Sequence, residues 1–213
     1  MIDLRLRQRF FDFDECEAFD LLKGNFEKYL RESMQVSALL LEECENEVEE
    51  TIAKIIEAFQ SGGSLYLCGN GGSAADSQHI AAEFVNGMSE SLQYPLPAVA
   101  LTTDTSVITS RANDYAFDTI FSRQLEAIGR PGDVLFGIST SGTSKNIVEA
   151  IKCAKRLGIS TILLSGARTS PKVEKIADIE VRIPCSETQH IQESMLIIEH
   201  YICAEVIKHF LNI

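Results

Sequence analysis

Apolar positions divide the chain into a helical first part and a second part in which short apolar runs alternate with helical segments. In the first part, helical spacing within residues 13–60 predicts two helices, one over about 15–41 and one over 45–60. Gly62 and Gly63 end the second helix. The first helix is more apolar than one docking face requires, which also indicates contacts between copies of the chain.

The second part carries five short apolar runs separated by helical patterns, an alternation typical of a parallel sheet with crossover helices. We therefore expect an α/β fold, a three-layer α/β/α sandwich with a five-stranded parallel sheet of the flavodoxin type, preceded by the two helices. One domain over residues 1–213 is expected, with its α/β core at about 64–211. The expected strands are 64–68, 97–101, 133–138, 159–164 and 178–183, and the expected helices are 74–87, 105–127, 144–157 and 187–211.

The charge of the chain restricts the class of ligand. A formal net charge of −12 repels nucleic acid phosphates and acidic membrane surfaces. An anionic metabolite can still bind where backbone N–H groups and hydroxyls make a loop favourable. The six cysteines are scattered without a C-x-x-C pair, the amino-terminal segment is too charged for a signal peptide, and no apolar run reaches the ~20 residues of a membrane helix. These features predict a soluble, cytoplasmic protein.

A hydroxyl-rich loop follows the third predicted strand and opens a helix. Free N–H groups at a helix start, the positive end of its dipole and short hydroxyl donors favour a phosphate monoester. The alternative is a Ser/Thr-rich turn with an N-cap, but such a turn needs only one or two hydroxyls. We favour the phosphate site. The five hydroxyls belong to Ser139, Thr140, Ser141, Thr143 and Ser144.

A glycine-rich loop follows the first predicted strand. Residues 69–74 satisfy the G-x-G-x-x-A pattern of dinucleotide-binding folds. That pattern expects an acidic residue about 20 positions on, whereas Asp104 at the end of the next strand lies some thirty residues away. His79 and Glu83 follow on one helix face at i, i+4 spacing, where they could share a metal or a substrate or form a solvated surface pair. A helix leaving a strand's carboxyl end points its first turns toward the ligand crevice, which favours the first reading.

The last predicted helix places Gln192 and His200 in an otherwise apolar run. Either could be a hydrogen-bonded core residue. Eight residues correspond to about 12 Å of helical rise, so one metal would strain to meet both from a straight helix. If both act in one site, a neighbouring subunit is expected to supply one of them. His209 near the end of the helix is explained by the helix dipole.

Three segments of the chain, 68–84, 111–147 and 190–200, together resemble the phosphoheptose isomerases of the sugar isomerase (SIS) domain superfamily. The resemblance covers about residues 25–211. It implies conversion of sedoheptulose 7-phosphate to D-glycero-D-manno-heptose 7-phosphate through an enediol-type intermediate, the first step toward heptose precursors of lipopolysaccharide or other surface glycans. It also implies a homotetramer with interfacial active sites and one zinc ion per subunit.

The resemblance assigns roles by motif. Glu83 matches the catalytic base and His200 the acid. A carboxylate that binds zinc strongly is not free to accept a proton, so the two roles that the resemblance gives Glu83, zinc ligand and catalytic base, conflict. The matched zinc ligands are His79, Glu83, Gln192 and His200; the matched substrate contacts are Asn70, Gly71, Gly72, Ser73, Glu83, Asn113, Asp114 and Gln192, with Ser139, Thr140, Ser141 and Ser144 as the phosphate loop.

The chain departs from the family pattern at three positions. Gly87 and His190 stand where many relatives carry Arg, and Met195 replaces a frequent His. An Arg is a bidentate donor for phosphate or hydroxyl groups, so its loss can change substrate affinity or preference unless Lys145 or Arg111 or a neighbour's side chain replaces it.

Three other functions are compatible with an SIS-type fold. Noncatalytic SIS adaptors that bind a replication-initiator protein lose the catalytic carboxylate, whereas Glu83 and His200 are both present here. Sugar-phosphate-sensing regulators usually carry a DNA-binding domain, and no basic helix-turn-helix segment is evident. Another phosphosugar isomerase of the same fold is the alternative that the sequence excludes least.

Overall fold

The computed structural model describes residues 24–88, 94–167 and 175–211. The chain forms two compact units, Met1–Gln35 and Val36–Ile213. In the first unit, residues 24–35 are described, and they contain the start of helix α3 (Asn25–Glu43). The second unit contains the rest of α3, the sheet and all the other described helices.

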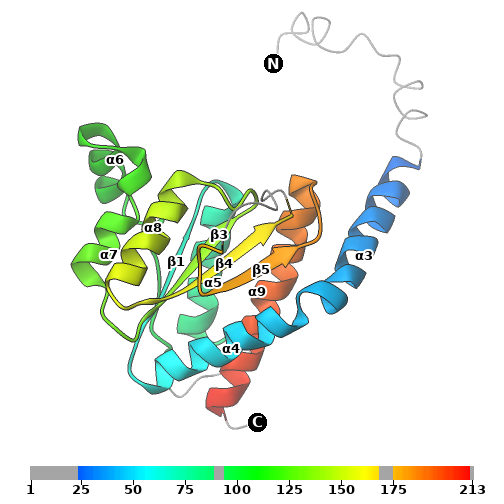
Figure 1. Cartoon of the computed structure of the whole chain (residues 1–213). Coiled ribbons are helices and arrows are strands. Elements are labelled where there is room, and N and C mark those ends of the chain that lie inside the picture. Colours follow the sequence, from blue (N-terminus) through cyan, green and yellow to red (C-terminus); the bar gives the residue numbers. More distant parts are fainter. Residues whose placement is uncertain (1–23, 89–93, 168–174, 212–213) are drawn as a thin grey trace, which may run out of the picture. The chain divides into compact units, whose positions relative to one another are not determined.

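Five parallel strands form one sheet in the order β2-β1-β3-β4-β5, which confirms the predicted α/β class and sheet (Figure 1). Strands β1, β3 and β4 are five to seven residues long and almost entirely buried, as expected where helices cover both faces, whereas the five-residue edge strand β5 alternates between buried and half-buried residues. The strands are β1 (Leu65–Gly69), β2 (Ala98–Ala100), β3 (Val134–Ser139), β4 (Ser160–Gly166) and β5 (Ile179–Ile183).

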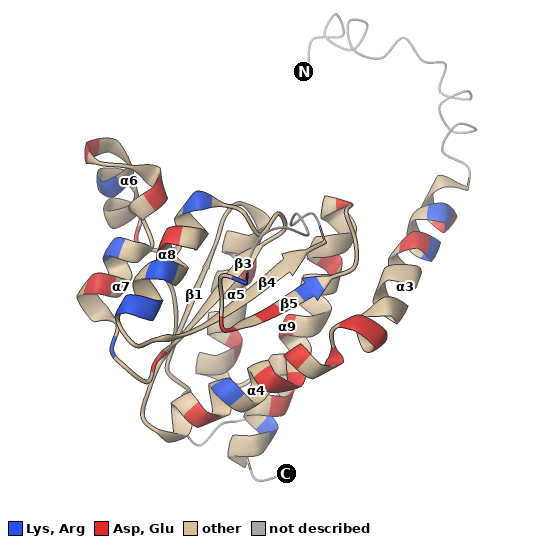
Figure 2. Cartoon of the chain, viewed as in Figure 1, with Lys and Arg blue, Asp and Glu red and all other residues tan. Residues whose placement is uncertain are grey.

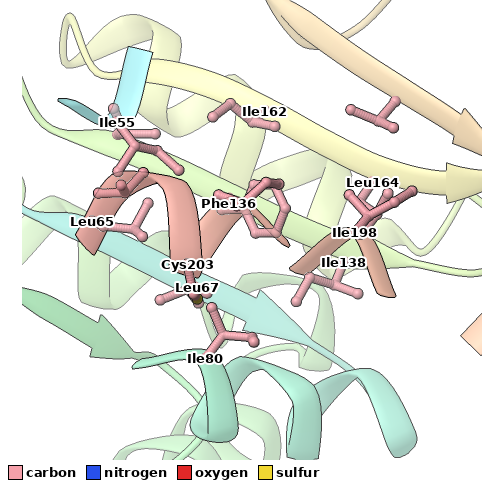
Figure 3. Close-up of a cluster of buried hydrophobic side chains, with 14 of the residues drawn as sticks. Ile55, Leu65, Leu67, Ile80, Phe136, Ile138, Ile162, Leu164, Ile198 and Cys203 are labelled. Carbon is pink, nitrogen blue, oxygen red and sulfur yellow. The ribbon is translucent and has the colours of Figure 1, made fainter. Parts of the chain in front are cut away.

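Side chains of successive strand residues enter two separate cores. Leu65 and Leu67 of β1 pack with α4, α5 and α9, whereas Tyr66 and Cys68 pack on the opposite face with α7 and α8. Figure 3 shows the first core, where Ile80 of α5 meets strand and α9 residues. The helices are α4 (Glu45–Gln60), α5 (Gly72–Asn86), α6 (Thr105–Asp114), the 3-10 turn η1 (Phe117–Thr119), α7 (Ser122–Ile128), α8 (Lys145–Arg156) and α9 (Thr188–Leu211).

Helix boundaries agree with the predictions except in two segments. Helix α4 has the predicted bounds. Helix α3 ends two residues beyond residue 41 but begins at Asn25, after Gly24 with φ 84°, so the predicted helix over 15–41 does not run through residue 24; its first part, residues 15–23, lies outside the described residues. The single helix predicted over 105–127 is wrong, because the chain forms α6, η1 and α7 there. The break follows Asn113 and Asp114, whose side chains bond to each other, and Ala116 is extended. Residues of these two types compete with helix hydrogen bonding, which explains the break.

The strand order reverses between β1 and β3. From β1 the chain crosses to β2 on one side, and from β3 it crosses to β4 on the other. Gly69 at the end of β1 pairs with Ile138 near the end of β3. The glycine loop and the hydroxyl-rich loop therefore leave the sheet side by side, at the switch point where ligands bind in folds of this type.

Acidic residues are concentrated on α4 and the adjoining end of α3 (Figure 2). This face repels polyanions, in keeping with the net charge of −12. The five described cysteines are free thiols. None of the described helices is long and apolar enough to cross a membrane.

Candidate active site

Two helices bring His79, Glu83 and His200 together. His79 and Glu83 lie one turn apart on α5, and His79 Nδ1 is 3.6 Å from Glu83 Oε1. His200 of α9 reaches the same ring, with 2.8 Å between the Nε2 atoms of the two histidines. Glu83 and His200 are half-buried, so the group is sheltered yet open to a small molecule. A carboxylate beside two imidazoles can accept and deliver protons.

The glycine loop opens α5 with a backbone that side chains would obstruct. Gly71 is the N-cap of α5 and has φ 57°, in the left-handed region that favours glycine. A Cβ on Gly69 would collide with the backbone of Ser73. Ser73 is buried, and its carbonyl accepts a hydrogen bond from Ser77. The loop is thus built for close approach of backbone N–H groups to a ligand, which is compatible with the substrate contacts predicted for residues 70–73.

Gln192 and His200 contact α5 at different levels within one chain. The Gln192 amide lies against the backbone of Gly72, where a Cβ would meet it, whereas His200 meets His79. Seven residues of α5 separate these contacts, about 10 Å of rise. The two helices therefore run parallel. Gln192 is placed at the glycine loop, and no hydrogen bond recorded in the described part of the chain joins it to the histidine pair.

Hydroxyl groups converge in the loop between β3 and α8. Ser139 Oγ lies 3.1 Å from Ser144 Oγ and 3.4 Å from Ser141 Oγ. The Gly142 N–H points to Ser139 Oγ at 3.2 Å, and the Thr143 N–H to Ser141 Oγ at 3.2 Å. Hydroxyls and N–H groups thus face one small region at the start of α8, where the helix dipole favours an anion.

The other predicted loop residues are placed less centrally. Thr140 is half-buried, and its carbonyl accepts from the Gly166 N–H at 3.2 Å. Asn113 and Asp114 end α6 and are both exposed. Asn113 Nδ2 donates to Asp114 Oδ1 at 2.8 Å. No contact recorded among the described residues joins this pair to the histidine pair, and their substrate role stays a prediction.

Two acids next to the histidines, the buried Glu199 and the half-buried Asp76, were not predicted from the sequence. Glu199 on α9 is 1% exposed, and burial together with the negative charge of Asp76 raises its pKa to about 8. Burial also raises the pKa of Asp76, and the nearby His79 opposes that shift. Among the described residues, neither oxygen of Glu199 nor Oδ2 of Asp76 has a hydrogen-bond partner. For Glu199, the sequence offered one signal, a charged residue within the apolar run of the last helix.

A third residue that the sequence did not reveal is Asn146, on the first turn of α8. It is buried, and its side chain hydrogen-bonds to that of Asn70 in the glycine loop. Its position directly after the hydroxyl-rich loop was the only signal in the sequence.

The residues that depart from the family pattern have structural roles. Gly87 ends α5 with φ 88°. His190 is buried, with Nδ1 3.2 Å from Glu193 Oε2, and Met195 is a fully buried core residue.

Arg111 donates to Thr119 Oγ1 and stacks over the ring of Tyr115, whereas Lys145 begins α8 with an exposed side chain. Of the two predicted substitutes for a missing Arg, Lys145 is the one placed beside the hydroxyl-rich loop.

The donor types of the site suit zinc. Imidazole nitrogens and a carboxylate are its usual ligands, and His79, Glu83 and His200 supply them on two adjacent helices. Within the described ranges, however, no three His, Cys, Asp or Glu side chains are arranged as a ready metal-binding group. The two Nε2 atoms instead share a hydrogen bond.

Comparison with known proteins identifies the family. The model of the SIS domain matches residues 28–166. The phosphoheptose isomerase of Aneurinibacillus thermoaerophilus is 45% identical over 181 residues, which cover 84% of this chain and 90% of that protein. The structure of phosphoheptose isomerase from Neisseria gonorrhoeae superposes with a TM-score of 0.77 at 36% identity, covering 85% of this chain and 97% of that chain. The corresponding structure from Francisella tularensis gives 0.80 at 30% identity, covering 87% and 97%. The chain belongs to the phosphoheptose isomerase family of SIS-domain proteins, and it is therefore an isomerase of phosphosugars.

Proposed function

We propose that the chain interconverts sedoheptulose 7-phosphate and D-glycero-D-manno-heptose 7-phosphate, at the start of heptose supply for lipopolysaccharide or other surface glycans. The observation that carries the proposal is the grouping of His79 and Glu83, on the helix that begins with the glycine loop, with His200 of α9. Its relatives at about 45% identity bear the name of this activity.

The length of the site supports a long sugar phosphate. The glycine loop lies beside the hydroxyl-rich loop, and His79 follows Gly72 by seven residues, about 10 Å along α5. An extended seven-carbon chain has a similar distance between its carbonyl end and its terminal phosphate. The phosphate would lie on Ser139, Ser141 and Ser144, and the carbonyl would lie beside His79, whose ring is 3.6 Å from the Glu83 carboxylate.

The chemistry needs one group that takes a proton from carbon and one that serves oxygen. In the proposed reaction the Glu83 carboxylate removes a proton from C1 of the ketose while His200 protonates O2, which gives an enediol. Loss of the O1 proton and return of the proton to C2 then give the aldose, so no atom is gained or lost. Such paired acid and base groups typically contribute ~10²–10⁴-fold each.

Zinc is proposed as the cofactor, one ion per subunit. His79, Glu83 and His200 would hold it, and Gln192 stays a predicted fourth ligand. When bound, the ion would stabilise negative charge developing on the substrate oxygens. Glu83 must then be released from the ion, or bind it weakly, to act as a base.

A homotetramer with interfacial sites is also proposed. Exposed apolar residues on two helices of the second unit support it: Leu41 is 71% exposed, and Ile197 and Tyr201 are each 50% exposed. They line a hollow of about 360 Å³ together with Leu40 and Val48. Covering such a surface with another copy would remove apolar area from water.

A different phosphosugar is the second candidate substrate. Gly87 and the buried His190, which stand where many relatives carry Arg, favour it, because neither position supplies a guanidinium.

The direct test is turnover of sedoheptulose 7-phosphate by the zinc-supplemented protein. We expect wild type to form the aldose and Glu83→Gln to lose at least about 100-fold in kcat while remaining folded. Glu205→Gln is the matched control, since Glu205 lies on α9 and pairs with Lys208. Wild-type inactivity would overturn the proposal, and turnover of a five- or six-carbon phosphosugar instead would favour the second candidate.

A further inference from the structure

Two asparagines join the loops that meet at the switch point. Asn70 Nδ2 donates to Asn146 Oδ1 at 2.9 Å, and Asn146 Nδ2 donates back to Asn70 Oδ1 at 2.7 Å. Asn70 directly follows β1, and Asn146 lies in the first turn of α8, which follows β3. The two amides therefore form a reciprocal pair across the crevice between the two loops.

A third hydrogen bond fixes the orientation of this pair. The backbone N–H of Ile147 donates to Asn146 Oδ1 at 3.0 Å, and only the oxygen of an amide can accept it. Turning the Asn146 amide over would set its NH2 group against that N–H. The orientation of Asn146 in turn requires Asn70 to present its oxygen to Nδ2 and its nitrogen to Oδ1.

Burial makes the pair costly to break. Asn146 is 2% exposed, and a buried amide left without partners costs about 1–3 kcal/mol. Asn70 is only half-buried. Each of its amide atoms uses one bond toward Asn146, so one N–H and one acceptor direction of Asn70 remain for a ligand.

We propose that Asn146 is a positioning residue that holds the Asn70 amide in a fixed orientation for substrate and ties the glycine loop to the phosphate loop. The inference rests on the proposed function, because it takes Asn70 as a substrate contact. Asn146 itself does not touch the substrate. Asn146 lies in the first turn of α8, which begins directly after Ser144 of the phosphate loop. Because Asn146 is also hydrogen-bonded to Asn70, a shift of one loop is transmitted to the other.

A double-mutant cycle tests this coupling. Asn70→Ala and Asn146→Ala are each expected to lower kcat/KM about tenfold. If Asn146 acts through Asn70, the double variant should lose no more than the worse single variant. Ile151→Val, a small truncation of a buried side chain five residues further along α8, controls for loss of stability and should leave kcat/KM unchanged.

Two outcomes would contradict a positioning role for Asn146. Losses that multiply in the double variant, or an Asn146→Ala effect no larger than that of Ile151→Val, would overturn the inference. If Asn146→Ala does not fold, Asn146→Asp replaces it, because the aspartate keeps the acceptor for Ile147. Its added charge would act equally with or without Asn70, whereas a positioning effect would vanish in the Asn70→Ala background.

The coupling of Asn70 and Asn146 can be tested even if the proposed isomerase activity is not found. Inactive wild-type protein would overturn the heptose isomerase proposal alone. The same cycle is then measured on the Kd for inorganic phosphate by titration calorimetry, since Asn146 adjoins the phosphate loop. Equal losses in Asn146→Ala and the double variant would support the coupling, and multiplied losses or no loss in Asn146→Ala would refute it.

Discussion

The Nε2 atoms of His79 and His200 lie 2.8 Å apart, although 121 positions separate the two residues in the chain. Their rings are nearly perpendicular, with an interplanar angle of 87° and centroids 5.0 Å apart. One nitrogen must donate and the other accept, so a single proton lies between the two rings. The same two nitrogens are the ones that a metal ion would take, and metal binding would release that proton.

Removing either histidine should therefore lower the zinc content. We expect His79→Ala and His200→Ala to fall well below one zinc per subunit when the ion is measured by mass spectrometry after dialysis, because each loses an imidazole ligand. His209→Ala is the control, since His209 pairs with Gln60 at the far end of α9. Full zinc content in both variants would remove the pair from the ligand set.

Mixing inactive subunits tests which chain supplies each group. Glu83 and His200 both contact His79 within one chain. A mixture of Glu83→Gln and His200→Ala subunits, unfolded and refolded together, should therefore regain no activity, because every site lacks one group. Mixed assembly is verified by mass spectrometry of differently tagged subunits. Recovery toward about a quarter of wild-type activity would instead mean that the two groups come from different chains.

Loss of a hydroxyl from the phosphate loop should weaken binding more than catalysis. Ser144→Ala removes a group 3.1 Å from Ser139 Oγ, and we expect KM to rise about 3–10-fold with a smaller change in kcat. Inorganic phosphate should become a weaker inhibitor by a similar factor. Ser110→Ala on α6, whose hydroxyl bonds to the Val107 carbonyl, is the control. A fall in kcat at unchanged KM would place Ser144 outside the phosphate site.

Stability should depend on acid pH through Asp178. Burial opposes ionisation of this carboxyl, but hydrogen bonds from Thr161 and the charge of Lys155 outweigh it and hold the pKa below the ordinary 3.8. The stabilising contribution is thus full above about pH 4 and is lost as pH falls below that value. Asp178→Asn should lower the free energy of unfolding by on the order of 1 kcal/mol at pH 7, since the group is half-exposed.

The pH profile itself provides the check. Urea unfolding of wild type and Asp178→Asn should differ at pH 7 and converge toward pH 3. Glu50→Gln, on the exposed side of α4, controls for removal of one negative charge. A difference that stays constant between pH 3 and 7 would show that the ionised carboxyl is not what stabilises the turn before β5.

The sequence predicted well those features that depend on local periodicity. Helix α4 follows from apolar residues at helical spacing, such as Ile52 and Ile55, and has the expected bounds. The buried strands follow from continuous apolar runs between turn residues. The break within 105–127 was missed because Asn113 and Asp114 favour a helix end without a glycine or proline to mark it.

The site was predictable in part. His79 and Glu83 share a helix face, so their proximity follows from i, i+4 spacing. The contact between His79 and His200 depends on how α5 and α9 pack, which no local pattern specifies. Asn146 was missed for the same reason, since its partner lies 76 residues away. Glu199 resembles a surface residue until its helix is seen to be buried.

The two margins of the sheet determine how copies of this protein can meet. One margin is β2, only three residues long, and the other is β5, where Glu180 and Arg182 form an ion pair beside the open backbone. A short strand and a charged strand are both poor templates for adding a further strand. Growth of the sheet from one molecule into the next is therefore disfavoured. The protein can expose apolar helices for assembly with little risk that its copies join edge to edge into aggregates.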